Sequence, residues 1–253
     1  DVYLYVTEST EDGGELPTTN IYKFRWANEK LVDRQLILSI PSFVTWHNGG
    51  IMTMGLDGTI YAIRGDQREP FGKLDYGILQ NNAKGEPDDT GVIFIIDKNT
   101  ELTPSKSADP SKYYYAIGIR NSFGLAVDPQ TGNLWDTENG DETYDEINLV
   151  HPKFNSGWNK IMGPANATQL ANLPAFKDFT YSDPKFSWKN TVAPTAILFA
   201  DDRLPTKFQN TVFVADCRGT IYNFKLNSQR DGFVFRNSDL ADNVADPDDD
   251  LSE

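Results

Sequence analysis

The chain has 253 residues, of which 37 are acidic and 23 basic, so its formal net charge is −14 at pH 7. This acidic balance argues against a nucleic-acid-binding protein, because phosphates require a basic surface, and against attachment to an anionic membrane. The single cysteine, Cys217, excludes a disulfide within the chain. No apolar run approaches the roughly 18 residues that a membrane-spanning helix needs, so an integral membrane protein is not expected. A neutral sugar or a cation remains compatible as a partner.

Strand after strand is predicted along the chain. Segments rich in Val, Ile, Tyr and Phe alternate with clusters of Gly, Pro, Asn and Asp, which is the pattern of short strands joined by tight turns. One short helix is predicted at 166–172. The predicted strands lie at 2–7, 20–26, 30–38, 51–54, 59–63, 91–97, 113–119, 123–127, 133–137, 147–150, 192–199, 211–215 and 220–226.

A weak internal repeat indicates the architecture. Segments beginning at Gly55, Val127 and Ala215 each contain a strand, a turn with Asp and Gly, and a second strand with an aromatic residue at the same place. Recurrent antiparallel units with almost no helix are typical of a β-propeller built from four-stranded blades. A β-sandwich is the competing all-β architecture, but shorter and more even loops are expected for it. We therefore predict an all-β fold with propeller architecture.

The length sets the number of blades. At roughly 45 residues per blade or more, a single domain over 1–253 accommodates four or five blades. Because an open propeller leaves two sheet edges bare, we expect terminal blades to be missing from this sequence. The last residues, 241–253, are strongly acidic and predict a mobile tail.

The densest group of motifs lies between Gly118 and Trp158. It contains G-x-R-N at 118–121, a strand–DPxTG–strand hairpin at 123–137, the loop E-x-G-x-x-x-x-D-E-x-N-L from Glu138, and N-x-G-W ending at Trp158. Upstream lie H-N-G-G at 47–50, GLDGTIYAI at 55–63 and G-D-Q at 65–67. Taken together, these motifs resemble the soluble quinoprotein (PQQ-dependent) aldose sugar dehydrogenases of the glucose/sorbosone dehydrogenase family. The resemblance implies a six-bladed propeller, PQQ and Ca²⁺ as cofactors, and a chain that is an incomplete copy.

Two residues are candidates for proton transfer. An imidazole titrates near neutral pH and can accept the hydroxyl proton of a sugar, and a carboxylate bonded to one ring nitrogen fixes its tautomer. His47 matches the catalytic base of the family, and Asp66 matches the aspartate that orients it. Taken without the resemblance, a lone histidine in a glycine-rich loop is more often a structural or surface residue.

Cofactor binding is the role that the resemblance implies for Arg120 and Asn121. A guanidinium can bind a carboxylate, and it can stabilise the negative charge that develops on a quinone during reduction, which is also a catalytic role. Alternatively, Arg120 pairs with one of the acidic residues nearby. The family's cofactor-binding lysine is expected near 216–219, where Cys217 takes its place and Arg218 is the nearest basic residue.

The acidic loop after Glu138 is the candidate metal site. Hard cations prefer several oxygen ligands, which carboxylates and loop carbonyls supply. The resemblance implies that the carbonyls of Gly140 and Asp141 hold the Ca²⁺ that polarises the quinone, and that Glu146, with Asp145, matches a second, structural Ca²⁺ position. The alternative is an ordinary solvated acidic surface.

Two functions of different classes are compatible with these observations. The first is a Ca²⁺- and PQQ-dependent oxidoreductase that oxidises an aldose sugar and passes electrons to an unknown acceptor. The second is an exported propeller that binds no cofactor and serves as a binding or scaffold module, because a fold does not determine a function. Either way, an extracellular, periplasmic or cell-surface location is expected.

Overall fold

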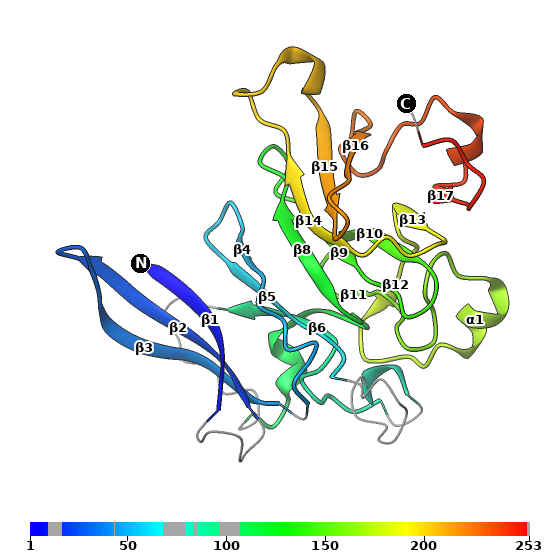
Figure 1. Cartoon of the computed structure of the whole chain (residues 1–253). Helices are drawn as coiled ribbons and strands as arrows, with labels where there is room; N and C mark the ends of the chain where they lie inside the picture. Colours follow the sequence, from blue (N-terminus) through cyan, green and yellow to red (C-terminus); the bar gives the residue numbers. More distant parts are fainter. Residues whose placement is uncertain (10–16, 43, 68–78, 83–84, 97–106, 252–253) are drawn as a thin grey trace.

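The chain folds into β-sheets with very little helix, as a computed structural model shows for residues 1–9, 17–42, 44–67, 79–82, 85–96 and 107–251 (Figure 1). Short 3-10 helices occupy Leu79–Asn81, Pro110–Tyr113, Thr206–Phe208 and Ser238–Leu240. In these ranges no helix combines the length and the hydropathy needed to span a membrane. The elements are β1 (Val2–Glu8), β2 (Thr18–Ala27), β3 (Lys30–Pro41), β4 (Met52–Met54), β5 (Ile60–Arg64), β6 (Val92–Ile96), β7 (Tyr114–Ile117), β8 (Ser122–Val127), β9 (Leu134–Glu138), β10 (Asp145–Val150), β11 (Phe154–Asn155), α1 (Ala167–Asn172), β12 (Thr180–Tyr181), β13 (Phe186–Trp188), β14 (Pro194–Phe199), β15 (Thr211–Asp216), β16 (Ile221–Lys225) and β17 (Val244–Ala245).

The strands form four sheets. Their orders are β1-β2-β3, then β12-β11-β7-β6-β5-β4, then β17-β13-β10-β9-β8, and last β14-β15-β16. The second sheet contains the antiparallel series β4-β5-β6-β7, and the third contains β8-β9-β10-β13. The all-β prediction is confirmed. Each of these two sheets has a four-stranded antiparallel core to which β11, β12 and β17 add short parallel pairs.

The repeated segments of the sequence are three equivalent hairpins. They form β4–β5, β8–β9 and β15–β16, each paired antiparallel. The turn glycines Gly58, Gly132 and Gly219 have φ values of 86°, 78° and 90°. A residue with a Cβ is strained in this left-handed region, so the recurring glycine follows from the geometry of the turn.

The hydrophobic core lies between consecutive sheets. Ile21 of the first sheet packs in one cluster with Phe94 of the second. Ile93 of the second sheet packs with Leu134 of the third, and Trp135 of the third packs with Phe224 of the fourth. Each sheet therefore stacks on the next one in chain order, and β8 lies against both β4 and β14 (Figure 1).

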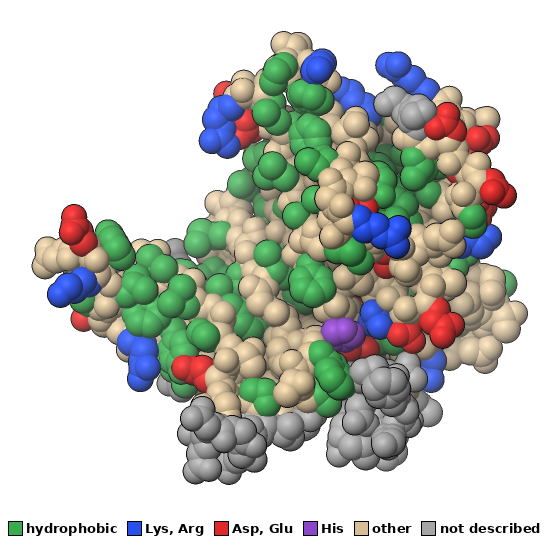
Figure 2. Space-filling model, viewed as in Figure 1, with side chains coloured by type: hydrophobic (Ala, Val, Ile, Leu, Met, Phe, Trp, Pro, Cys, Tyr) green, Lys and Arg blue, Asp and Glu red, His purple; other side chains and the backbone are tan. Residues whose placement is uncertain are grey.

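The first and last sheets also carry exposed apolar side chains on the view in Figure 2. Leu4, Val6 and Trp26 are exposed on the first sheet, and Leu198 and Ile221 on the last. Each of these two sheets packs one face against a neighbouring sheet, and the residues of that face belong to the core.

Part of the acidic C-terminal segment is docked on a sheet. Within the predicted tail of 241–253, Val244–Ala245 form β17, which pairs in parallel with β13, and Ala245 is buried. Lys189 and Asp246 form an ion pair with a nitrogen–oxygen distance of 2.6 Å. Acidic composition alone did not reveal this, because the apolar pair that docks the segment is only two residues long.

Candidate functional site

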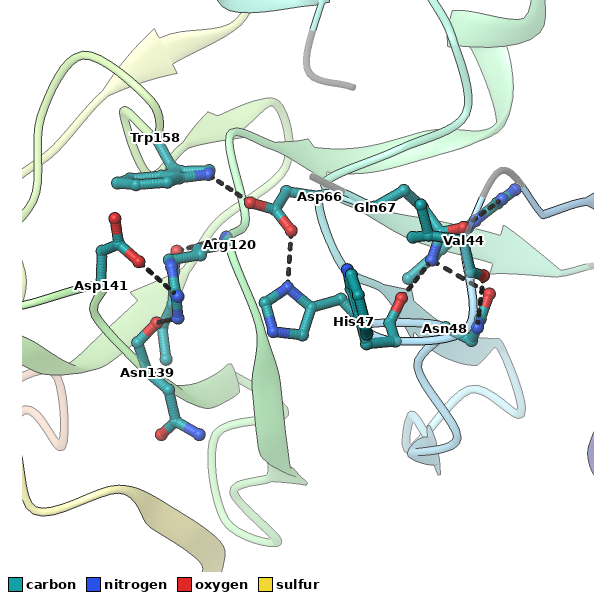
Figure 3. A network of polar contacts seen from close by, with 12 residues as sticks. Val44, His47, Asn48, Asp66, Gln67, Arg120, Asn139, Asp141 and Trp158 are labelled. Atoms are coloured by element: carbon teal, nitrogen blue, oxygen red, sulfur yellow. Dashed lines mark hydrogen bonds and ion pairs between the residues drawn. The ribbon is translucent and has the colours of Figure 1, made fainter. Parts of the chain in front are cut away.

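Connections between strands bring the predicted catalytic residues together. The loop that precedes β4 carries His47, the segment after β5 carries Asp66, and the segment after β7 carries Arg120 (Figure 3). Two backbone hydrogen bonds join these connections: Gly65 N donates to His47 O over 3.0 Å, and Asp66 N donates to Arg120 O over 2.8 Å. The relative positions of the three side chains are therefore fixed by the main chain.

Two glycines allow this close approach. Gly49 has a φ of +83°, and a Cβ on it would lie 2.0 Å from the carbonyl oxygen of Ile63. A Cβ on Gly65 would lie 2.7 Å from Arg120 O and 2.9 Å from His47 O. Only glycine fits at these positions without moving backbone, which gives a physical reason for the H-N-G-G and G-D motifs.

His47 and Asp66 form a hydrogen-bonded pair. Nδ1 of His47 lies 2.6 Å from Oδ1 of Asp66, and the second carboxylate oxygen, Oδ2, accepts a bond of 2.8 Å from the indole Nε1 of Trp158. Asp66 is buried, whereas the His47 side chain is 22% exposed. An ionised carboxylate can only accept, so neutral His47 carries its proton on Nδ1 and leaves Nε2 as an acceptor.

The buried Gln67 side chain holds the histidine loop. Its Nε2 donates to Trp46 O over 2.8 Å and to Asn48 Oδ1 over 3.0 Å. Asn48 Nδ2 in turn donates to Val44 O over 3.1 Å. These bonds flank His47 on both sides and explain why a glutamine follows the G-D pair.

Arg120 lies beside this pair and is half-buried (Figure 3). Its Nη1 donates to Asn139 O over 3.0 Å, and its Nη2 donates to Asp141 Oδ1 over 2.8 Å. The guanidinium carbon lies 5.5 Å from the centre of the Trp158 ring, a cation–π distance. Arg120 Nε is buried and has no hydrogen-bond partner among the described residues. One donor of the guanidinium is therefore left unsatisfied within the described residues.

The other predicted cofactor residues lie on neighbouring connections. Asn121 follows Arg120 and is half-buried; its carbonyl oxygen accepts from Asn139 N over 2.8 Å. Arg218 is exposed in the turn between β15 and β16, and Cys217 N donates to Ala193 O over 2.9 Å.

Asp145 connects the segment before β14 to the acidic loop. One of its carboxylate oxygens accepts from Gly140 N over 2.8 Å, and the other accepts from Val192 N and Ala193 N over 2.5 and 2.6 Å. Both oxygens are engaged by main-chain N–H groups, so this side chain joins two loops.

The four predicted metal residues do not converge on one point. Asp141 is exposed and bonded to Arg120, whereas Glu146 is buried and accepts from Gly163 N over 2.6 Å. Asp145 and Glu146 are adjacent on β10 and have different partners, because successive side chains of a strand point to opposite faces. Across the described ranges, no three Asp, Glu, His or Cys side chains gather as a metal-binding group.

Glu138 and Glu146 form a buried acidic pair. Glu146 lies opposite Glu138 in the β9–β10 register, and Ser156 Oγ donates to Glu138 Oε2 over 2.6 Å and lies 3.3 Å from Glu146 Oε2. Burial raises the pKa of Glu146 to about 7, and it raises the pKa of the neighbouring Asp136 to about 7 as well. Burial, together with the charges of Glu146 and Asp136, raises the pKa of Glu138 well above its usual value.

These carboxyl groups predict an unusual dependence of stability on pH. In the unfolded chain they titrate near pH 4, so between about pH 4 and 7 the folded state binds more protons than the unfolded state. Stability of the metal-free protein should therefore rise as the pH falls from about 8 to about 5. Melting temperatures measured in the presence of a chelator test this. Glu138→Gln should flatten the dependence, whereas Glu142→Gln removes the same charge from an exposed position and should not. A melting temperature that falls over this interval would contradict the account.

Two members of the site were not assigned a role from sequence. Trp158 ended a recognised motif, and a buried tryptophan needs a partner for its N–H, but the sequence does not say that the partner is Asp66. Glu138 could have been recognised by its spacing. Asp136 and Glu138 alternate on β9, and their partners across the ladder are Asn148 and Glu146. A pattern of acids at every second position on facing strands is the signal of one shared polar face.

Comparison with known proteins supports the resemblance. The chain is 27% identical over 222 residues to an uncharacterized protein of Synechocystis, covering 84% of this chain and 52% of that one. It is 30% identical over 186 residues to quinoprotein glucose dehydrogenase B of Acinetobacter calcoaceticus, covering 64% of this chain and 37% of the relative. The PQQ-bound structure of aldose sugar dehydrogenase from Streptomyces coelicolor has the same fold, with a TM-score of 0.60 at 22% identity over 92% of this chain and 60% of that one.

The coverage is unequal: the chain spans about half or less of the length of these two curated relatives. The sequence profile described as glucose/sorbosone dehydrogenase matches residues 1–244, nearly the whole chain. The chain therefore belongs to the glucose/sorbosone dehydrogenase family.

Proposed function

We propose that this protein is an oxidoreductase that oxidises an aldose sugar with PQQ and Ca²⁺. The observation that carries the proposal is the His47–Asp66 pair, with a nitrogen–oxygen distance of 2.6 Å, beside an arginine that retains an unpaired buried donor. The stacked antiparallel sheets support the architecture proposed with it, a six-bladed propeller of which this chain supplies four or five blades.

His47 would act as the general base. With Nδ1 bonded to Asp66, the lone pair on Nε2 can accept the anomeric hydroxyl proton of the sugar, and Asp66 stabilises the imidazolium that results. Asp66 is only 2% exposed, so this charge interaction is screened little by water. PQQ, when bound, would supply the acceptor for the hydride that leaves the anomeric carbon.

The residues near His47 fit a quinone that carries carboxylates. Arg120 Nε is a buried donor without a partner, and the half-buried Asn121 stands next to it. The guanidinium would hold the cofactor and stabilise the negative charge that forms during reduction. Arg218, the nearest cation to the turn where a lysine is expected, would reach the cofactor from the exposed β15–β16 turn.

Calcium would occupy two positions. The carbonyls of Gly140 and Asp141 would hold the ion next to the quinone, as the family resemblance implies. For the structural ion, Glu146 remains the proposed ligand. Its partner would be Glu138, which lies opposite it in the β9–β10 register, rather than Asp145, whose side chain points to the other face of the sheet. Two buried carboxylates about one hydroxyl offer the oxygen ligands that a hard cation prefers.

Calcium is accordingly expected to raise the melting temperature of chelator-treated protein at pH 8, because the ion would neutralise the buried carboxylates. Glu146→Gln should remove most of this gain. Glu142→Gln, an exposed change in the same acidic loop, should retain it. Equal melting temperatures with and without calcium would refute the structural site while leaving the His47 pair untouched.

The alternative is an exported propeller that binds no cofactor and serves as a binding or scaffold module. The observation in its favour is that Arg120 already bonds Asp141 and Asn139, and that Cys217 stands where the family has a lysine. A titration of PQQ absorbance in the presence of calcium decides between the two. Saturable binding that Arg120→Ala weakens supports the enzyme, and no spectral change supports the module. Both functions are proposed for an extracellular, periplasmic or cell-surface protein, and the enzyme's electron acceptor is a separate partner.

A further inference from the structure

Trp158 touches both halves of the proposed site. Its indole Nε1 donates to Asp66 Oδ2 over 2.8 Å, and the face of its ring lies 5.5 Å from the Arg120 guanidinium carbon (Figure 3). The side chain is buried, with 7% of its surface exposed. One residue thus contacts both the Asp66 carboxylate and the guanidinium that would hold the cofactor.

A pair of buried amides fixes the backbone of Trp158. Asn81 Nδ2 donates to Trp158 O over 2.6 Å and to Asn155 Oδ1 over 2.9 Å, and Asn155 Nδ2 donates back to Asn81 Oδ1 over 2.8 Å. Trp158 N donates to Gly118 O over 3.1 Å, two residues before Arg120. The indole therefore has little freedom to follow Asp66 if the carboxylate turns.

Two other buried tryptophans differ from Trp158 in the hydrogen bonding of their indole N–H groups. Trp135 and Trp188 pack in the core, and their Nε1 atoms have no hydrogen-bond partner among the described residues. The fold therefore tolerates a buried indole for packing alone, and the directed bond from Trp158 to Asp66 is not what burial by itself produces.

We propose that Trp158 is a positioning residue for the proton-transfer pair; the proposal rests on the proposed function. The indole bond to Oδ2 restricts rotation of the Asp66 carboxylate about its Cβ–Cγ bond. With Oδ2 bound to the fixed indole, Oδ1 faces Nδ1 of His47, and this holds the imidazole in the tautomer whose Nε2 accepts a proton. The ring supports Arg120 on its face through a cation–π contact, which aligns the guanidinium with the same pair.

The tautomer of His47 tests the proposal without any cofactor. The chain contains only two histidines, so the ¹⁵N signals of the His47 ring can be assigned by comparison with His151→Gln. In the wild type at a pH where His47 is neutral, Nδ1 should show the signal of a protonated nitrogen and Nε2 that of an unprotonated one. Trp158→Phe retains a ring under Arg120 but removes the N–H, and it should convert His47 to a mixture of both tautomers. Trp188→Phe removes an indole N–H that has no partner and should leave the His47 signals unchanged.

Two outcomes would overturn the proposal: a Trp158→Phe variant with the wild-type tautomer, or a wild type without the Nδ1–H form. If Trp158→Phe does not fold, the same bond is tested from its other end. Asp66→Ala should shift the indole N–H signal of Trp158 and speed its hydrogen exchange, and an unchanged signal would count against the proposal.

Turnover with bound PQQ provides a separate readout. Trp158→Phe should lower kcat about 10–100-fold with little change in KM, the usual effect of losing one hydrogen bond to a charged group. An inactive wild type with a pure Nδ1–H tautomer would refute the proposed function and leave the positioning role intact. An active wild type with unaltered kcat in Trp158→Phe would refute the positioning role alone.

Discussion

Replacing Arg230 by methionine is expected to lower the free energy of unfolding by about 3–5 kcal/mol, the range for breaking a buried ion pair. Arg230 Nε and Nη2 donate to the two carboxylate oxygens of Asp128 over 2.7 and 2.8 Å, and both residues are buried. Arg230 Nη1 also donates to Asn210 Oδ1 over 2.9 Å. This bidentate pair joins the β8–β9 turn to the segment after β16, so its loss leaves Asp128 uncompensated between two sheets.

Urea denaturation measures this effect, and the chain offers a matched control. Arg203 pairs with Asp201 in a strongly exposed position, so Arg203→Met should change stability by less than about 1 kcal/mol. Adding Asp128→Leu to Arg230→Met should restore part of the loss, because the unpaired charge is then removed. A loss at Arg230 no larger than that at Arg203 would show that the buried pair does not hold the two sheets together.

Replacing His47 by alanine is expected to lower the rate of sugar oxidation about 10²–10⁴-fold, the usual contribution of a general base. His47 accepts the substrate proton, whereas Arg120 would hold the cofactor, so PQQ affinity should remain close to that of the wild type. Arg120→Ala should show the reverse pattern and weaken PQQ binding itself. Dye reduction and PQQ absorbance, measured on the same preparations, separate the two effects.

His151 is the control for this experiment. It is the only other histidine in the chain, and its Nε2 lies 2.8 Å from Ser182 Oγ. His151→Ala should retain the wild-type rate. If His47→Ala oxidises sugar as fast as His151→Ala does, His47 is not the base.

The hairpins could be predicted from sequence because local rules determine them, whereas the His47–Asp66 pair was implied by the family resemblance. The repeated Asp-Gly turns require glycine at a positive φ, and they formed β4–β5, β8–β9 and β15–β16 as predicted. The resemblance carried by H-N-G-G and G-D implied that His47 and Asp66 would lie together, and the close approaches at Gly49 and Gly65 explain why those motifs are compact.

The arrangement of the candidate metal residues was harder to predict, because it depends on which strands pair and in which register. Asp145 and Glu146 are neighbours in sequence, but on β10 they face opposite sides of the sheet, and only Glu146 meets Glu138. The role of Trp158 depends on a contact with Asp66 across 92 residues of sequence. Neither a local motif nor composition contains that information.

We propose that the connections around His47 form a quinone-dependent sugar oxidation site. Sugar-dependent dye reduction by the full-length protein, supplied with PQQ and Ca²⁺ and offered several aldoses, tests this, with His47→Ala in parallel. We expect a saturable rate in the wild type that requires PQQ and is lost in His47→Ala. A wild type that binds no PQQ and reduces no dye with any aldose would contradict it and favour the binding-module function.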